Sequence, residues 1–178
     1  MEDLKYQRRW WTLAVLSVSL IIIGLDNTIL NVALPTIQQT LQASASELQW
    51  IVDAYVLVFA GLLLTMGSLG DRFGRKRTLQ AGLVIFGGAS FVASHSQSAT
   101  QLIGARAAMG IGGALIMPST LSIITDIFPR EERGKAIGIW TGMAALGIGT
   151  GPLLGGWLVE NFRWGADFPF NIVNDVSN

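Results

Sequence analysis

The sequence predicts an all-α membrane protein with five transmembrane helices. Of its 178 residues, 51% are hydrophobic and only 13% are charged, whereas soluble domains carry roughly 25% charged residues. The apolar residues form long runs, and charged residues gather between them. The net charge is zero and cysteine is absent, so composition indicates no nucleic-acid partner and excludes disulfides and thiolate metal sites.

The first predicted span covers residues 10–34 and is broken only by Asp26, Asn27 and Asn31. A helix of this length crosses about 30 Å of hydrocarbon at ~1.5 Å per residue. A cleavable signal peptide is the alternative, because residues 43–45 resemble a cleavage site. The apolar run is longer than the usual h-region, however, and contains a charge.

The other four spans are predicted at residues 48–70, 78–95, 102–124 and 136–159. The polar segments between them are expected to be loops, at residues 35–47, 67–77, 96–101 and 126–135. Residues 1–9 form a polar amino terminus, and residues 160–178 form a polar, aromatic tail. The sequence therefore predicts one membrane domain, residues 10–159, with short polar ends.

Lysine and arginine alternate between successive loops. They precede the first span and recur in loops 67–77 and 126–135, whereas loops 35–47 and 96–101 contain neither. Cytoplasmic loops carry the excess of positive residues. The amino terminus is therefore predicted to be cytoplasmic, and the tail after the fifth span to lie outside.

Three ionisable residues fall inside the predicted spans: Asp26, Asp53 and Arg106. A charge at the bilayer centre costs roughly 2.5–3.5 kcal/mol and usually faces a bundle interior or a cavity. At ~1.5 Å per residue they lie ~13, ~7 and ~6 Å below the outer boundary. Such a carboxylate can exchange a proton or neutralise a cationic ligand. The alternative for Asp53 and Arg106 is a purely structural pair, or side chains that reach to the interface.

Glycine follows a helical period in the fifth span. Gly147, Gly151 and Gly155 recur every four residues and share one face, a spacing that lets two membrane helices approach closely. Pro152 removes a backbone hydrogen bond and favours a kink, and Gly156 thins the helix further. Generic helix packing is the simpler interpretation of this spacing alone.

Several short segments resemble the motifs of one transporter family. Residues 67–77 contain a glycine followed by Asp-Arg-x-Gly-Arg-Lys, and residues 147–156 contain Gly-x-x-x-Gly-Pro-x-x-Gly-Gly. Residues 25–35, residues 50–55 and the Arg-x-x-x-Gly-x-Gly of residues 106–112 follow the same order. These segments resemble the major facilitator superfamily, and within it the amino-terminal part of the fourteen-helix drug/proton antiporters.

The resemblance implies a cytoplasmic latch. Asp71 and Arg75 would tie the two transporter halves together in one state, and Gly67 and Gly74 would permit the helix approach that the latch needs. Arg72 belongs to the same motif, although topological anchoring is the favoured interpretation of this arginine.

The resemblance also implies roles within the membrane. Arg106 would take part in proton transfer, and Asp26 and Asp53 in proton coupling or in binding lipophilic cations. Gly151 and Pro152 would give a kinked, tightly packed fifth helix that limits leakage. Family members work by alternating access between two pseudo-symmetric halves.

The chain departs from the family where it ends after five spans. We expect residues 160–178 to reflect truncation or a frameshift, so that a carboxy-terminal half or other copies would be needed for a complete pathway. The alternatives are a non-transporting membrane fragment, or a symporter or metabolite exporter of the same superfamily.

The function that we expect is multidrug efflux by proton antiport across a bacterial plasma (inner) membrane. Its partners would be the lipid bilayer, protons and small amphipathic, often cationic substrates. The energy source would be the proton gradient, with no cofactor and no metal. We expect no enzymatic activity, because the sequence shows no nucleophile–base constellation and no phosphate-binding loop.

Overall fold

The computed structural model describes residues 2–161, and all regular structure in that range is helical. The five helices are α1 (Glu2–Leu41), α2 (Ala45–Phe73), α3 (Arg75–Ser94), α4 (Ala99–Ile127) and α5 (Arg130–Asn161). The predicted all-α fold is therefore confirmed. The tail predicted at residues 160–178 lies outside the described residues, except that Glu160 and Asn161 end α5.

Three predicted loops are largely helical, including residues 126–135, where α4 ends at Ile127 and α5 starts at Arg130. α1 continues through Pro35 to Leu41, because Ala33 and Ile37 keep the same apolar face fully buried beyond the expected end of the span. α2 then begins at Ala45 in a capping box. The Ser44 backbone N–H donates to a Glu47 carboxylate oxygen at 2.9 Å, and the Glu47 N–H donates to the Ser44 hydroxyl at 3.3 Å.

The segment predicted as a loop at residues 67–77 is also helical on both sides of one residue. α2 runs to Phe73, α3 starts at Arg75, and Gly74 alone separates them. Gly74 has φ +94°, a region that side-chain-bearing residues rarely adopt. The polar residues of this segment continue the two helices, because a helix can extend beyond the hydrocarbon core of a membrane.

Four of the described helices are long and apolar enough to cross a membrane, namely α1, α2, α4 and α5. The exception among the described helices is α3, which has 20 residues and includes Gln80 and several glycines and serines. It occupies the predicted third span without reaching the same combination of length and hydropathy.

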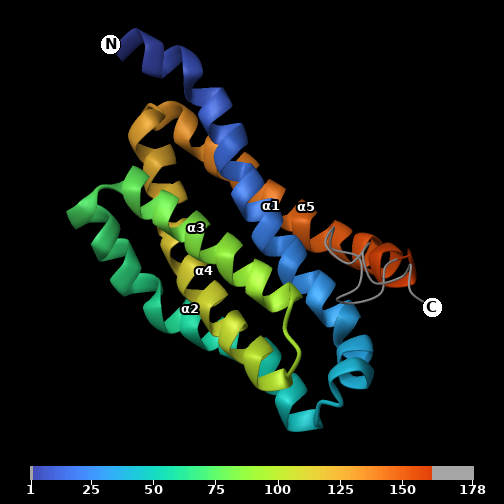
Figure 1. Ribbon diagram of the computed structural model, residues 1–178. Coiled ribbons are helices and arrows are strands. Elements are labelled where there is room, and N and C mark those ends of the chain that lie inside the picture. The colour runs from blue at the N-terminus through green and yellow to red at the C-terminus, as the bar shows by residue number, and fades with distance from the viewer. Residues whose placement is uncertain (1, 162–178) are drawn as a thin grey trace, which may run out of the picture.

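α4 is the central helix. It packs extensively against α2 and α3, whereas α1 packs mainly against α5 and only lightly against α4 (Figure 1). Its buried face includes Leu102, Met109 and Ile116. The protein thus consists of a three-helix group, α2–α4, joined to the α1–α5 pair.

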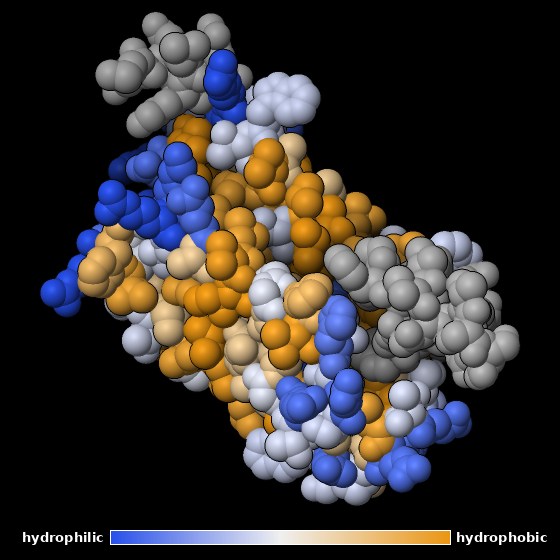
Figure 2. Space-filling view, viewed as in Figure 1, coloured by the Kyte–Doolittle hydropathy of each residue, from blue (hydrophilic) through white to orange (hydrophobic). Residues whose placement is uncertain are grey.

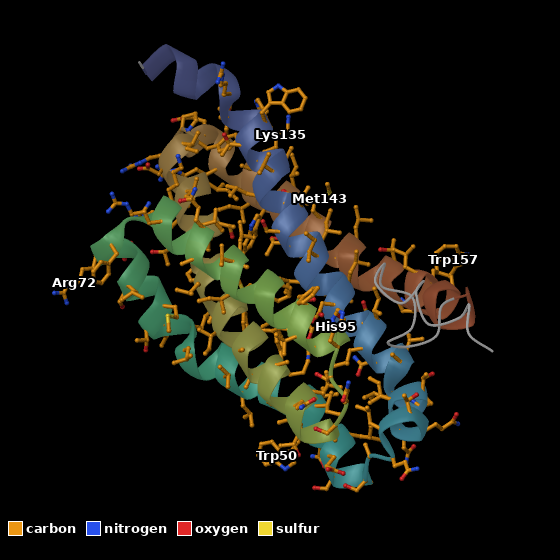
Figure 3. The ribbon with its side chains drawn as sticks, viewed as in Figure 1. Trp50, Arg72, His95, Lys135, Met143 and Trp157 are labelled. Carbon is orange, nitrogen blue, oxygen red and sulfur yellow. The ribbon has the colours of Figure 1, made fainter. Side chains whose placement is uncertain are left out.

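The surface has polar ends and an apolar middle. Figure 2 shows a broad hydrophobic band between hydrophilic residues at the upper left and at the bottom. Arg72 and Lys135 lie toward the end that carries the amino terminus, and Trp50 and His95 lie toward the other (Figure 3). The loops that sequence analysis placed on opposite sides of a membrane therefore lie at opposite ends of the bundle.

Candidate functional site

The side chain of Arg106 is the centre of the site. It lies two turns into α4, whose start is capped by Ser98, with the Gln101 N–H donating to the Ser98 hydroxyl at 3.3 Å. Only 2% of Arg106 is exposed. Since arginine is almost never fully buried without partners, the surroundings of this guanidinium determine what the site can do.

Two helices besides α4 contribute polar partners to Arg106. From α1, the Asp26 carboxylate accepts from Nη1 at 2.5 Å and the Asn27 side-chain oxygen accepts from Nη2 at 3.2 Å. From α2, the Ile51 backbone carbonyl accepts from Nε at 3.3 Å. The guanidinium is therefore hydrogen-bonded to both helix groups, and its charge is neutralised from α1.

An aromatic face completes this environment. The Arg106 Cζ lies 4.5 Å from the centre of the Tyr55 ring, within cation–π distance. Tyr55 is 4% exposed and stacks on Phe59, with ring centres 5.8 Å apart and planes inclined by 11°. A buried aromatic ring on α2 therefore lies against the cation from α4.

Small residues on α4 allow this contact. A Cβ on Gly110 would lie 2.7 Å from the Tyr55 carbonyl oxygen, and one on Gly113 would lie 3.0 Å from the Tyr55 hydroxyl. On another face, a Cβ on Gly112 would lie 2.7 Å from the backbone nitrogen of Phe86 in α3. Sequence analysis placed Gly110 and Gly112 in a motif with Arg106, and the structure gives these glycines a packing reason.

Asp53 does not join the cluster. It is half-buried on α2 and makes no hydrogen bond or ion pair with any described residue. The structural alternative in which Asp53 pairs with Arg106 is wrong, because Asp26 takes that position. Of the two carboxylates considered near one guanidinium, only Asp26 is bonded to it.

The pair formed by Asp26 and Arg106 is asymmetric in exposure. The Asp26 side chain is 22% exposed and that of Arg106 is 2% exposed. Removing one partner of a buried ion pair costs about 3–5 kcal/mol, because the other charge stays uncompensated. A proton or an external cation that reaches Asp26 would compete with Arg106 for the carboxylate, and this competition is the chemistry that the site offers.

Sequence reasoning missed three contributors to this site: the Ile51 carbonyl, Asn27 and Tyr55. Asn27 and Tyr55 stood inside quoted motifs, and each is a polar group within an apolar run. A polar side chain inside an apolar run was therefore the sequence signal that could have identified both residues. No sequence pattern indicates that a particular backbone carbonyl will face a guanidinium.

The predicted latch residues meet at the amino-terminal end of the bundle. Arg75 Nε lies 3.5 Å from the Asp71 carboxylate, and Arg75 Nη1 donates to the Ser122 carbonyl of α4 at 2.9 Å. An open hollow of about 540 Å³ is lined by Asp71, Arg75, Asp126 and two glycines. The Asp71 side chain is 68% exposed, so this pair alone adds at most about 1 kcal/mol to stability.

The glycines of the latch have other roles than the predicted close approach. A Cβ on Gly67 would make only an ordinary contact, 3.6 Å from Pro118, and one on Gly74 would meet nothing within 4 Å. Gly74 is needed for its positive φ instead. Arg72 is exposed, and its Cζ lies 5.5 Å from the Phe73 ring centre.

The glycine face of α5 packs closely on α1. A Cβ on Gly147 would lie 2.7 Å from the Ile21 carbonyl oxygen, and one on Gly155 would lie 3.2 Å from the Ile29 Cα. A Cβ on Gly151 would overlap the side chain of Thr28. The glycines at four-residue spacing therefore lie where α5 comes closest to α1.

Of three further residues on α1 and α5, one takes part in the contact between these helices and two do not. Gly24, which sequence analysis did not single out, supplies the matching small residue on α1, where a Cβ would lie 3.1 Å from the Ala144 carbonyl oxygen. Gly156 faces open space, so it does not contribute to the contact, and Pro152 is exposed inside the continuous helix.

In the part of the chain that the structure describes, no three His, Cys, Asp or Glu residues are placed to hold a metal ion.

Comparisons with known proteins place the chain in a wider group. The family model described as Major Facilitator Superfamily matches residues 16–173. The methyl viologen resistance protein SmvA of Salmonella typhimurium is 45% identical over 166 residues, which are 93% of this chain and 34% of that protein. The multidrug efflux pump LfrA of Mycolicibacterium smegmatis is 48% identical over 162 residues, which are 90% and 32% of the two chains.

A more distant relative and a solved structure complete the comparison. The riboflavin transporter RibZ of Clostridioides difficile is 36% identical over 166 residues, or 93% of this chain and 36% of that protein. The crystal structure of a bacterial homologue of the human lysosomal transporter Spinster, inward-facing and unoccupied, superimposes with a TM-score of 0.70 at 22% identity, covering 88% of this chain and 37% of that one. The chain therefore spans about a third of the length of these curated relatives.

Proposed function

The chain belongs to the Major Facilitator Superfamily, and from that premise we propose that it is the amino-terminal part of a proton-coupled drug exporter. The observation that carries the proposal is the ion pair between Asp26 and the buried Arg106, inside two helices apolar enough to cross a membrane. Ionisable residues at such depth face bundle interiors and mark ion or substrate pathways.

The pair supplies a mechanism for exchange. With Asp26 ionised, the Arg106 charge is neutralised across the boundary between α1 and α4. A proton on Asp26 removes that attraction, and so does a cationic substrate that takes over the carboxylate. Proton and substrate then compete for one group, which is the requirement for antiport driven by a proton gradient.

The substrate class follows from the carboxylate and from the relatives. Several relatives are named for resistance to organic compounds, among them methyl viologen, which is a dication, and puromycin. Asp26 is 22% exposed, enough to be reached from a cavity. We therefore assign small amphipathic, often cationic substrates to the site, with Asp53 as a second carboxylate available to them because no described group neutralises it.

Two other features fit alternating access between two halves. Asp71 and Arg75, with Arg72 beside them, form the cytoplasmic latch that would close against a second half, and their exposure leaves them available for it. The close contact between α1 and α5 through Gly147 and Gly151 would keep the α1–α5 pair together during the cycle.

The proposed location is a bacterial plasma (inner) membrane with the amino terminus in the cytoplasm. The positive residues of two loops lie at the amino-terminal end of the bundle, and this is the distribution that cytoplasmic loops carry. The partners would be the bilayer, protons and a carboxy-terminal half, since the relatives are about three times as long.

A transport assay tests the proposal. The chain is expressed alone and also fused to the remaining two thirds of the methyl viologen relative, and efflux of a cationic dye from energised vesicles is measured. We expect the fusion to export the dye and Asp26→Asn to abolish export. Glu131→Gln, a matched exposed carboxylate at the start of α5, should leave export unchanged. Equal export by both variants would contradict the role of Asp26.

The chain tested alone discriminates the alternatives. Export by the unfused chain would mean that copies assemble into a pathway. Lack of export by the unfused chain, together with export by the fusion, would mean that the chain by itself is a non-transporting membrane fragment.

A second candidate is transport of a metabolite. The observation that favours it is the 36% identity to a riboflavin transporter. Export of riboflavin but not of cationic dyes by the fusion protein would support it over drug efflux.

A further inference from the structure

Tyr55 provides a contact for Arg106 that does not depend on the charge of Asp26. We infer that Tyr55 is a positioning residue, whose ring face keeps the Arg106 guanidinium in place on α2 and α4 whenever Asp26 is protonated or occupied by a cation. The inference deepens the proposed function and rests on it for its biological purpose. The contacts of Arg106 that support the inference do not depend on that function.

The partners of Arg106 fall into two classes. Asp26 and Asn27 come from α1, and the bond to Asp26 is the one that a proton disrupts. The Ile51 carbonyl at 3.3 Å and the Tyr55 ring at 4.5 Å come from α2, and both are neutral. A carbonyl oxygen and a π face attract a cation equally well whatever the protonation state of a carboxylate elsewhere.

Helix packing makes the partners from α2 the permanent ones. α4 packs extensively on α2 and only lightly on α1, and Gly110 brings the α4 backbone directly onto the Tyr55 carbonyl. Arg106 and Tyr55 therefore belong to one packed unit. If α1 shifts when Asp26 loses the pair, the guanidinium remains on its aromatic partner instead of following α1.

Tyr55 contacts Arg106 through the face of its ring and not through its hydroxyl. The hydroxyl is buried and makes no hydrogen bond of normal geometry with any described residue, although the Asn27 side chain lies near it. The ring of Phe59 lies nearly parallel to the Tyr55 ring, with ring centres 5.8 Å apart. Phenylalanine should therefore replace Tyr55 in this role, whereas leucine, which is apolar but lacks a π face, should not.

Few other titratable groups face the pair. Tyr55 on α2 contacts Arg106 directly, and Asp53 lies two residues before it on the same helix. Residues 10–41 of α1 and 99–125 of α4 contain no titratable side chain besides the pair itself. Residues 78–94 of α3 and 136–157 of α5 contain no titratable side chain. Replacement of Asp26 by asparagine thus reproduces the uncharged state without disturbing a second nearby group.

Chemical labelling of arginine tests the inference without any transport. The full chain in lipid vesicles is treated with phenylglyoxal, and the labelling rate of Arg106 is followed by mass spectrometry, with the exposed Arg72 as internal standard. In Asp26→Asn we expect slow labelling like that of the unmodified protein. In Asp26→Asn with Tyr55→Leu we expect labelling faster by about tenfold, the order that a desolvated cation–π contact contributes. Tyr55→Phe in the same background should stay slow.

The controls separate positioning from general loosening. Phe86→Leu in the Asp26→Asn background removes an aromatic ring that is 6% exposed in the same core. The cation–π contact of Arg106 among the described residues is with Tyr55 and not with Phe86, so this variant should label slowly. Fast labelling in Asp26→Asn alone would overturn the inference, as would equal rates for Tyr55→Phe and Tyr55→Leu, or fast labelling with Phe86→Leu. A failed transport assay would leave these rates unchanged, so the two proposals fail independently.

Discussion

A single methyl group at Gly151 should separate α1 from α5. The Cβ of Gly151→Ala would overlap the Thr28 side chain. Thr28 cannot simply rotate away, because its hydroxyl donates to the Gly24 carbonyl at 2.9 Å. Overpacking of this kind costs about 1–3 kcal/mol. Because Gly147 and Gly155 on either side also lie close to α1, the helices have little room to adjust, which places Gly151→Ala toward the upper part of that range.

Gly149→Ala is the matched control on the same helix. A Cβ there meets nothing within 4 Å, so the substitution should be neutral, or stabilising by up to ~1 kcal/mol through helix propensity. The measurement is SDS-induced unfolding followed by circular dichroism in mixed micelles. Equal destabilisation by Gly149→Ala and Gly151→Ala would refute the packing argument. So would a failure of Thr28→Gly to restore the stability of Gly151→Ala.

Three further substitutions test the ion pairs and the break between α2 and α3. Arg106→Leu should cost about 3–5 kcal/mol because it leaves a charge without its buried partner, as measured by the same unfolding titration. Gly74→Ala should cost about 1–2 kcal/mol from its positive φ alone, while Gly61→Ala, with open space inside a helix, should not. Glu132→Gln should weaken the link to Arg9, whose Nε donates to Glu132 at 2.9 Å, and this loss should shrink as salt is raised.

The helices could be predicted from the sequence, but their ends could not. Hydrophobic runs mark where the chain can lie in lipid, and this fixed the order of the five helices. Hydropathy does not report polar helical turns outside the hydrocarbon. The capping box at Ser44 and the burial of Ile37 beyond Pro35 decide those ends, and the first needs local hydrogen-bond geometry while the second needs tertiary packing.

The residues of the candidate site could also be predicted only in part from the sequence. Asp26 and Arg106 could be selected because a charge inside an apolar run is costly wherever it faces. The choice of Asp26 over Asp53 as the partner of Arg106 depends on which helix faces approach each other. Which faces approach depends on small residues such as Gly110, where the backbone of α4 lies against α2, and such a contact is visible only once the helices are packed.

The most direct test of the central claim is to measure protons released when a cationic substrate binds. The fusion of this chain to the remaining two thirds of the methyl viologen relative is purified in weakly buffered detergent. Tetraphenylphosphonium is then added, and the pH is recorded. The account predicts proton release that disappears in Asp26→Asn and persists in Glu131→Gln. Undiminished release from Asp26→Asn would contradict competition between proton and substrate for Asp26.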